Sequence, residues 1–279
     1  LRVVLLGSAS LNIQSGLRES LAGRFELIRA HHWNFQESQQ EFDWNLEQYL
    51  KFGGYPAAAR YIEDTERWQS YIKDSIIEPV IGRDILGMVS ITKPSLFRQT
   101  FEIAMHYPAQ TLSYQKIVGQ LQERGSTETV KHYLEILESA FLLRQVFKFS
   151  TRPLSTRESS PKLVPLAPAL VHAFSSPKRI DVDNDWRGHI FESVVGAALA
   201  QATDKLFTWR ERNLEVDYVM NIDGKIYAIE VKSGRRTRRS GLDAFLNSFP
   251  AATPIIVTPE NCGPILTSDP LAGVEALRQ

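Results

Sequence analysis

The chain has 279 residues, enough for two domains, and its 43% hydrophobic and 23% charged content is ordinary for a globular protein. Lys plus Arg and Asp plus Glu number 32 each, so no overall charge draws nucleic acid and any such contact must come from local patches. The single cysteine, Cys262, excludes an internal disulfide and a cysteine-based metal cluster, and no apolar run approaches the ~18 residues of a membrane span, so we expect a cytoplasmic protein without membrane contact.

The chain begins without Met, directly in the apolar run LRVVLLGSAS. This run predicts a buried strand at Val3–Leu6, followed by a loop, a helix at Gly16–Ala22 and a strand at Phe25–Arg29. Such a beginning is what we expect of a fragment of a larger protein.

The stretch GSAS…SGLRESLAGRFELIRAHHWNF resembles the sensor-1 strand and the following segment of a bacterial and archaeal family of AAA+ ATPases. Members of this family carry a C-terminal domain of unknown function that contains a winged helix and a nuclease-like fold. The resemblance implies that Ser8 or Ser10 senses the γ-phosphate of ATP and that Arg24 reaches a neighbouring subunit's nucleotide; a surface ion pair is the alternative for Arg24.

The phosphate-binding motif G-x-x-x-x-G-K-[ST] does not occur in the sequence. We therefore expect no ATP hydrolysis by this chain. ATP would bind only to a full-length protein that includes the missing N-terminal ATPase part, and a homo-oligomer is a further expectation.

Residues 44–90 have a helical pattern. A helix at Trp44–Phe52 is predicted to end at the Gly-Gly-Tyr-Pro sequence that follows, and Thr65 is predicted to cap a second helix that Pro79 kinks or ends. Residues 1–92 are thus interpreted as a partial AAA+ core with its helical lid.

Residues 93–166 fit a winged helix-turn-helix. Leu96–His106 is one predicted helix, Ser113 caps the next, and Ser126 or Thr127 caps the third after an Arg124-Gly125 turn. Two wing strands are predicted at Phe141–Phe149 and Lys162–Pro165.

In winged helices, the N-terminal part of the last helix enters the major groove of DNA. The residues at this place are Thr127, Thr129, Lys131 and His132. The wing adds a positive excess suited to phosphates, from Arg144, Lys148, Arg152, Arg157 and Lys162. Many winged helices bind proteins instead, and Glu128 would face the groove, so protein contact is the alternative.

Residues 167–279 are interpreted as a third domain with a mixed sheet flanked by helices. An exposed joint is predicted over 166–185, then a helix at Trp186–Gln201 whose small residues allow close packing on a sheet. Glu192 on this helix needs a partner, for which Arg187 and His189 are candidates. Its later elements are predicted as strands Leu206–Arg210 and Ala252–Thr258 and helices Leu242–Ser248 and Leu271–Arg278.

A β-hairpin is predicted from Leu214–Asn221 and Lys225–Val231, which meet at Asp223-Gly224, a dipeptide suited to a type I′ turn. The two-residue loop predicts the register. It pairs Ile222 with Lys225, Met220 with Tyr227, Tyr218 with Ile229, and Asp217 with Glu230. Alternation places Val216, Tyr218 and Met220 on one face, and Asp217, Val219 and Glu230 on the other.

Opposed carboxylates repel each other unless a proton or a cation is shared. Mg²⁺ or Mn²⁺ between Asp217 and Glu230 would remove the conflict, and Lys232 on the same face as Glu230 could orient an attacking water. The spacing Asp217…Glu230-x-Lys232 resembles the signature of the PD-(D/E)XK nucleases, which implies a restriction-endonuclease-like sheet and adds Glu192 as a further acid.

Arg235 and Arg236 follow in a basic run that is a candidate clamp for a nucleic-acid backbone. The leading interpretation is a DNA-binding fragment of an AAA+ ATPase with a metal-dependent nuclease-like domain. The alternatives are a non-enzymatic module of the same architecture, in which the charges only meet solvent, and a winged-helix transcription regulator.

Overall fold

The computed structural model describes residues 4, 24, 26, 28–88, 91–150, 159–234 and 240–278. Several residues with predicted roles lie outside these ranges, and those roles stay predictions: Ser8, Ser10, Arg152, Arg157, Arg235 and Arg236. Arg24 is described and exposed, and Ile28 and Arg29 belong to no strand, contrary to the end of the strand predicted there. Within the same ranges, no helix has the length and apolar character to cross a membrane.

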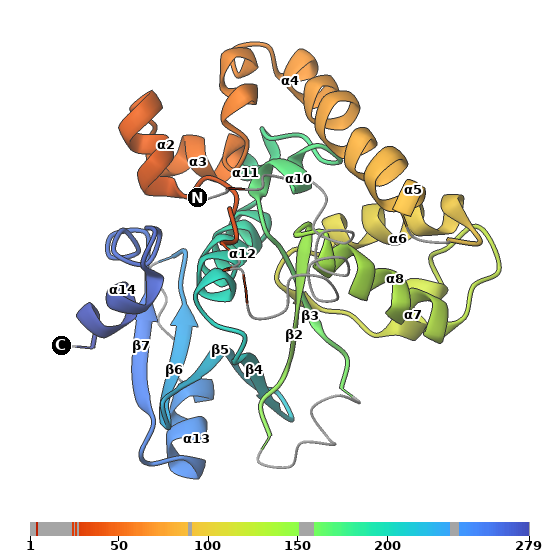
Figure 1. Ribbon diagram of the computed structural model, residues 1–279. Helices are drawn as coiled ribbons and strands as arrows, with labels where there is room; N and C mark the ends of the chain where they lie inside the picture. Colours follow the sequence, from red (N-terminus) through yellow and green to blue (C-terminus); the bar gives the residue numbers. More distant parts are fainter. Residues whose placement is uncertain are drawn as a thin grey trace.

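In the described ranges, a seven-stranded mixed sheet runs through the molecule in the order β1-β3-β2-β4-β5-β6-β7 (Figure 1). The β2–β4 and β6–β7 pairs are parallel and the others are antiparallel. The strands are β1 (Gln110–Thr111), β2 (Leu143–Lys148), β3 (Lys162–Pro165), β4 (Leu206–Glu211), β5 (Leu214–Ile222), β6 (Lys225–Val231) and β7 (Thr253–Val257). The predicted combination of helices with a mixed sheet is therefore confirmed.

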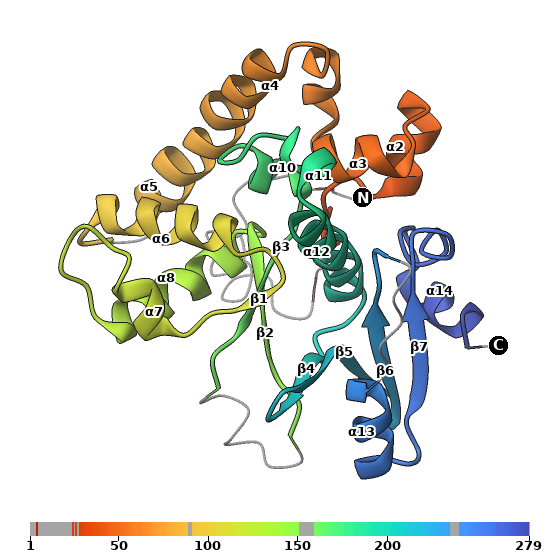
Figure 2. The same ribbon diagram turned by 180° about the vertical axis from the view of Figure 1, so that it is seen from behind.

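The helices cover both faces of this sheet. Those of the N-terminal part are α2 (Phe35–Phe42), α3 (Leu46–Phe52), the 3₁₀ helix η1 (Pro56–Tyr61), α4 (Thr65–Tyr71), the π-helical segments η2 (Ile72–Ile77) and η3 (Pro79–Ile85), and α5 (Leu86–Met88). The others are α6 (Pro94–His106), α7 (Tyr114–Val118), α8 (Thr127–Ser139), α10 (Pro168–His172), α11 (Arg179–Val182), α12 (Asn184–Ala202), α13 (Ser240–Ser248) and α14 (Pro270–Ala276). From both sides, α12 lies in the centre of the molecule, between α6–α8 and the β6–β7 edge (Figures 1 and 2).

The helix that begins at Thr65 does not end at Pro79. It widens into two π-helical segments, which continue to Ile85. Proline lacks an N–H and its ring clashes with the carbonyl four residues earlier, so a wider turn accommodates it. The cap is also different from the predicted one, because Asp64, one residue before Thr65, accepts the Arg67 N–H.

The segment from α6 to β3 has the element order helix, strand, helix, helix, strand, strand, with its strands ordered β1-β3-β2. Both predicted caps are confirmed: Ser113 accepts the Lys116 N–H and Ser126 accepts the Thr129 N–H. The predicted wing strand Lys162–Pro165 coincides with β3.

The exposed joint predicted over 166–185 is wrong for its first half. Residues Pro168–His172 form α10, all of whose residues are buried. This apolar turn packs against α3 and α12, because PALVH is apolar enough to enter the core despite its proline. Only the later part meets solvent, as at Val182, which is 85% exposed.

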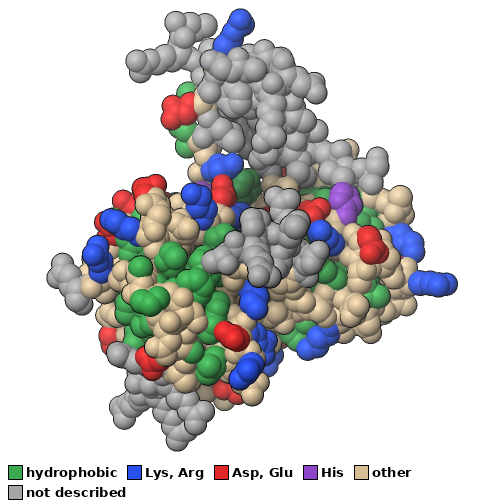
Figure 3. All heavy atoms as spheres, turned by 90° about the horizontal axis from the view of Figure 1, so that it is seen from below, with side chains coloured by type: hydrophobic (Ala, Val, Ile, Leu, Met, Phe, Trp, Pro, Cys, Tyr) green, Lys and Arg blue, Asp and Glu red, His purple; other side chains and the backbone are tan. Residues whose placement is uncertain are grey.

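One large apolar core reaches from Tyr49 to Val274 and includes Val164 and Ala167 on either side of the predicted domain boundary. The domain division stays a prediction. A smaller core lies on the other face of the sheet under α13, around Trp209 and Phe245. On the side that holds α13, hydrophobic side chains also reach the surface (Figure 3).

Candidate active site

The β5–β6 hairpin has the predicted turn. Asp223 and Gly224 have φ of 50° and 82°, and only a type I′ turn places both central residues in the left-handed region. The pairs Ile222–Lys225, Met220–Tyr227 and Tyr218–Ile229 are confirmed. The turn therefore sets the register of both strands.

Beyond Tyr218 the predicted alternation fails, because β5 holds one extra residue opposite β4. Phe207 pairs with Val219 but Trp209 pairs with Val216, the mark of a β-bulge. Val216 consequently packs in the smaller core with Val219, and the face predicted for it is wrong.

The bulge also changes how Asp217 meets β6. The β5–β6 register ends at Tyr218–Ile229, so the direct pairing of Asp217 with Glu230 is not formed. Instead, the Asp217 carboxylate accepts the Val231 N–H at 2.7 Å and replaces a ladder hydrogen bond. The side chain is thereby fixed at the open end of the hairpin.

Helix α12 lies close against this end of β5. A Cβ on Gly196 would lie 2.1 Å from the Tyr218 hydroxyl, so only glycine permits the approach. The Tyr218 hydroxyl donates to the Glu192 carbonyl at 2.9 Å, which fixes the turn of α12 that carries the Glu192 carboxylate.

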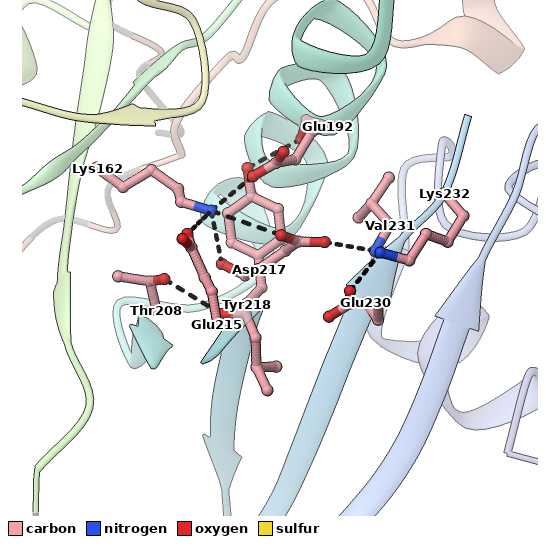
Figure 4. Close-up of polar contacts among 10 residues, drawn as sticks. Lys162, Glu192, Thr208, Glu215, Asp217, Tyr218, Glu230, Val231 and Lys232 are labelled. Atoms are coloured by element: carbon pink, nitrogen blue, oxygen red, sulfur yellow. Dashed lines mark hydrogen bonds and ion pairs between the residues drawn. The ribbon is translucent and has the colours of Figure 1, made fainter. Parts of the chain in front are cut away.

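These elements bring the predicted acids together around one open cleft of about 320 Å³ (Figure 4). Its lining includes Glu192, Asp217 and Glu230, with Lys162, His189, Arg210, Glu215 and β1. Lys232 contacts Glu230 and is 23% exposed. The four residues predicted as catalytic are thus assembled, while their roles stay predictions.

Lys162 was predicted as a wing residue for phosphates, and this is wrong. Its side chain is 1% exposed and points into the acidic cleft (Figure 4). The Nζ atom lies 2.6 Å from Glu192 Oε1, 3.0 Å from Glu215 Oε1 and 3.8 Å from Asp217 Oδ1. Glu192 therefore has Lys162 as its partner, whereas Arg187, one of the predicted partners, pairs with Glu47.

Burial dominates the protonation of the cleft. Burial raises the pKa of Glu192 and of Asp217. The pKa of Glu230 is raised to about 7, first by burial and then by the negative charge of the Asp217 carboxylate. Burial opposes the charge on Lys162, yet the carboxylates of Glu192 and Asp217 raise its pKa well above the usual value. Burial and Lys162 lower the pKa of His189, which favours the neutral ring.

The carboxylates of the cleft outnumber the ammonium groups that pair with them. Among the described side chains, the carboxylates of Glu192, Glu215, Asp217 and Glu230 form ion pairs only with the ammonium groups of Lys162 and Lys232, and Arg210 at the wall of the cleft pairs with none of them. One buried oxygen, Glu230 Oε2, has no hydrogen-bond partner in the described part of the chain.

No group of three His, Cys, Asp or Glu side chains within the described ranges has the arrangement of a metal centre. Mg²⁺, however, is commonly held by one or two carboxylates and completed by water and phosphate oxygens. Asp217 and Glu230 fit that kind of site, and they do not fit an all-protein cage.

The predicted nucleic-acid contacts are available only in part. Lys131 and His132 on α8 are exposed. Thr127 and Thr129 are half-buried and hydrogen-bonded to Glu128 and Ser126.

Two of the five basic residues predicted for the wing, Arg144 and Lys162, form ion pairs with carboxylates. Arg144 contacts Glu138 at 3.2 Å and Asp204 at 3.4 Å, and Lys162 is buried. The described Lys and Arg side chains seen in Figure 3 are spread over that face and do not form one patch. Lys148 is exposed, and Arg152 and Arg157 lie outside the described residues, so the charge that the whole wing presents to a phosphate backbone stays a prediction.

Parts of the chain match two families that are described only as domains of unknown function. Residues 43–181 match the model of a domain of unknown function, DUF8612, and residues 187–263 match that of another, DUF4143. The uncharacterised proteins Mb2031c of Mycobacterium bovis and Rv2008c of Mycobacterium tuberculosis are each 27% identical over 256 residues, 86% of this chain. The chain spans about half of these relatives, since the match covers 55% of their length. No solved structure matches the chain.

Proposed function

We propose that this chain is the nucleic-acid-binding portion of a larger AAA+ ATPase, and that its cleft cleaves phosphodiesters with Mg²⁺ or Mn²⁺. One observation carries the proposal: α12, β5 and β6 bring Glu192, Asp217 and Glu230 to the same cleft, and Lys232, directly after β6, contacts Glu230 there. The likeness to the PD-(D/E)XK signature and the helix-flanked mixed sheet support it.

Each residue has a role that its surroundings suit. When bound, the metal ion would polarise the phosphate and lower the pKa of a water. Asp217 and Glu230 would hold the ion, through the free Glu230 Oε2 and the carboxylate fixed by the Val231 N–H. Lys232 is partly exposed beside Glu230 and would orient the attacking water.

Arg210 is a further candidate that the sequence did not single out. It is exposed at the wall of the cleft, on β4 beside the acidic residues. A guanidinium there offers a bidentate contact to a substrate phosphate and offsets the repulsion between that phosphate and the carboxylates.

The α6–β3 segment would bind duplex nucleic acid as a winged helix. Its element order and its β1-β3-β2 strands support this assignment. Gln110 and Thr111 of β1 line the cleft, so a duplex on this segment would lie next to the acidic residues. Lys131 and His132 are the exposed residues of α8 that would contact it.

The test is nicking of supercoiled plasmid in Mg²⁺ or Mn²⁺, with EDTA as the blank. Glu230→Ala and Lys232→Met should abolish nicking. Lys225→Met is the matched control, because Lys225 is an exposed lysine at the start of β6, whereas Lys232 directly follows the end of that strand. Failure to nick with several metals, or equal nicking by Glu230→Ala, would reject the enzymatic proposal.

A non-enzymatic module is the second candidate. The Lys162 ion pairs favour it, because a carboxylate cluster neutralised by a buried lysine also serves to join β3 to α12. In that case the wild type and Asp217→Ala would shift duplex DNA equally in gels, with no dependence on metal.

The roles of Ser8, Ser10 and Arg24 in ATP sensing belong to the longer protein of this proposal. They would appear only when the phosphate-binding motif is supplied by an N-terminal part.

A further inference from the structure

The buried lysine of the cleft has no role in the proposed cleavage of phosphodiesters. Lys162 begins β3, whereas Glu192 lies on α12 and Glu215 and Asp217 lie on β5. Its ammonium contacts Glu192 and Glu215 and also donates to the Asp217 carbonyl at 3.3 Å. An ammonium has three N–H donors, so these three acceptors satisfy it completely.

The position of this ammonium decides which carboxylates are free. Glu192 and Glu215 each have an oxygen within 3.0 Å of Lys162 Nζ. The same Nζ atom lies over the ring of Tyr218, 5.2 Å from the ring centroid. A divalent ion at Glu192 would lie within a few ångströms of a buried positive charge, and it would lose more by repulsion than in open solvent.

On the other side of Asp217 the situation is reversed. Glu230 is 6% exposed, and its Oε2 atom is buried without a hydrogen-bond partner among the described residues. The Asp217 Oδ1 atom lies 3.8 Å from Lys162 Nζ, whereas its Oδ2 atom accepts the Val231 N–H on the β6 side, next to Glu230 (Figure 4).

We propose that Lys162 is a built-in counter-ion that occupies a second cation position, so that the cleft binds one divalent ion, at Asp217 and Glu230, and not two. The inference rests on the proposed function of the cleft. It makes Lys162 a positioning residue, which acts through Glu192 and Glu215.

The test is the number of Mn²⁺ ions bound, measured by equilibrium dialysis and by the loss of the free Mn²⁺ EPR signal. The wild type should bind one ion and Lys162→Met two, whereas Lys162→Arg, which keeps the charge, should bind one. In Lys162→Met/Glu192→Gln the extra ion should be lost again, because one of its ligands is gone. One ion bound by Lys162→Met with unchanged affinity would overturn the inference.

Two measures keep the test decisive. Should Lys162→Met unfold without metal, Mn²⁺-dependent refolding that Lys162→Met/Glu192→Gln does not show would support the inference, and its absence would contradict it. Glu230→Gln separates the two proposals, since it should weaken the affinity for the Mn²⁺ ion that the wild type binds by about 10-fold or more. A wild type that binds no ion overturns the proposed metal chemistry, whereas a gain of one ion in Lys162→Met would still identify Lys162 as the counter-ion.

Discussion

The two ends of the β5–β6 hairpin are made in different ways. At the turn end, Asp223 and Gly224 alone fix the register, and the strand pairs follow from residues adjacent in sequence. At the open end, Asp217 and Glu230 depend on a β-bulge, on α12 and on Lys162, which is 55 positions away from Asp217. The turn end is thus determined locally, whereas the candidate site is determined by distant elements.

Removal of the Lys162 ammonium should have the largest effect on the free energy of unfolding. Lys162→Met leaves the largely buried Glu192 carboxylate and the half-exposed Glu215 carboxylate without their cation, which should cost about 3–5 kcal/mol of the free energy of unfolding. Urea unfolding at pH 7.5 in EDTA measures this loss. Lys148→Met, an exposed lysine at the end of β2, is the control and should change the stability by less than about 0.5 kcal/mol. A loss equal to that of the control would mean that the cluster does not need its ammonium.

The open end should also depend on pH. The pKa of Glu230 rises from 4.5 to about 7 on folding, because burial and the Asp217 carboxylate disfavour its charge. Folding therefore takes up protons, so this stability is fully present below pH 4.5 and is lost as the pH rises through 7.

Without metal, the wild type should lose on the order of 2–3 kcal/mol through Glu230 between pH 5 and pH 8. Glu230→Gln should remove this part of the slope. Glu211→Gln, at an exposed position on β4, should keep the wild-type slope. Parallel curves for the wild type and Glu230→Gln would show that Glu230 titrates normally.

The close approach of α12 should give a smaller effect. Gly196→Ala puts a methyl group against the Tyr218 hydroxyl and should destabilise the fold by about 1–3 kcal/mol in thermal or urea unfolding. Tyr218→Phe removes the nearest clashing atom and leaves the ring carbon Cζ, 2.4 Å from the added Cβ, so the double variant should lose less than the sum of the single changes. Simple additivity would contradict the contact.

The turn end should show the smallest effect. A Cβ on Gly224 would meet no atom within 4 Å, so Gly224→Ala costs only the strain of a φ of 82°. We expect about 1 kcal/mol in urea unfolding, with the cleft and its metal binding unchanged. A loss of Mn²⁺ binding in this variant would show that the two ends are not independent.

The same contrast explains what the sequence could predict. The Asp-Gly turn and the serine caps of α7 and α8 were predicted because each depends on residues within a few positions. Period-two alternation predicted Glu230 correctly on β6. It failed for Val216 because nothing in the run VDYV signals the bulge.

Lys162 could not be predicted as a site residue, because its partners lie 30 positions away on α12 and further still on β5. One signal was present: a lysine directly beside the apolar run LVPL is poorly placed for solvent. The buried position of α10 is hard to predict because a proline is typical of loops, whereas its apolar neighbours pack in the core.

The most direct test is a crystal of the wild-type chain soaked in Mn²⁺ and measured at a wavelength where manganese scatters anomalously. We expect one anomalous peak, between the Asp217 carboxylate and Glu230 Oε2, with the Lys162 ammonium still bound to Glu192 and Glu215. An empty map at that position, or a peak beside Glu192 with Lys162 displaced, would contradict it.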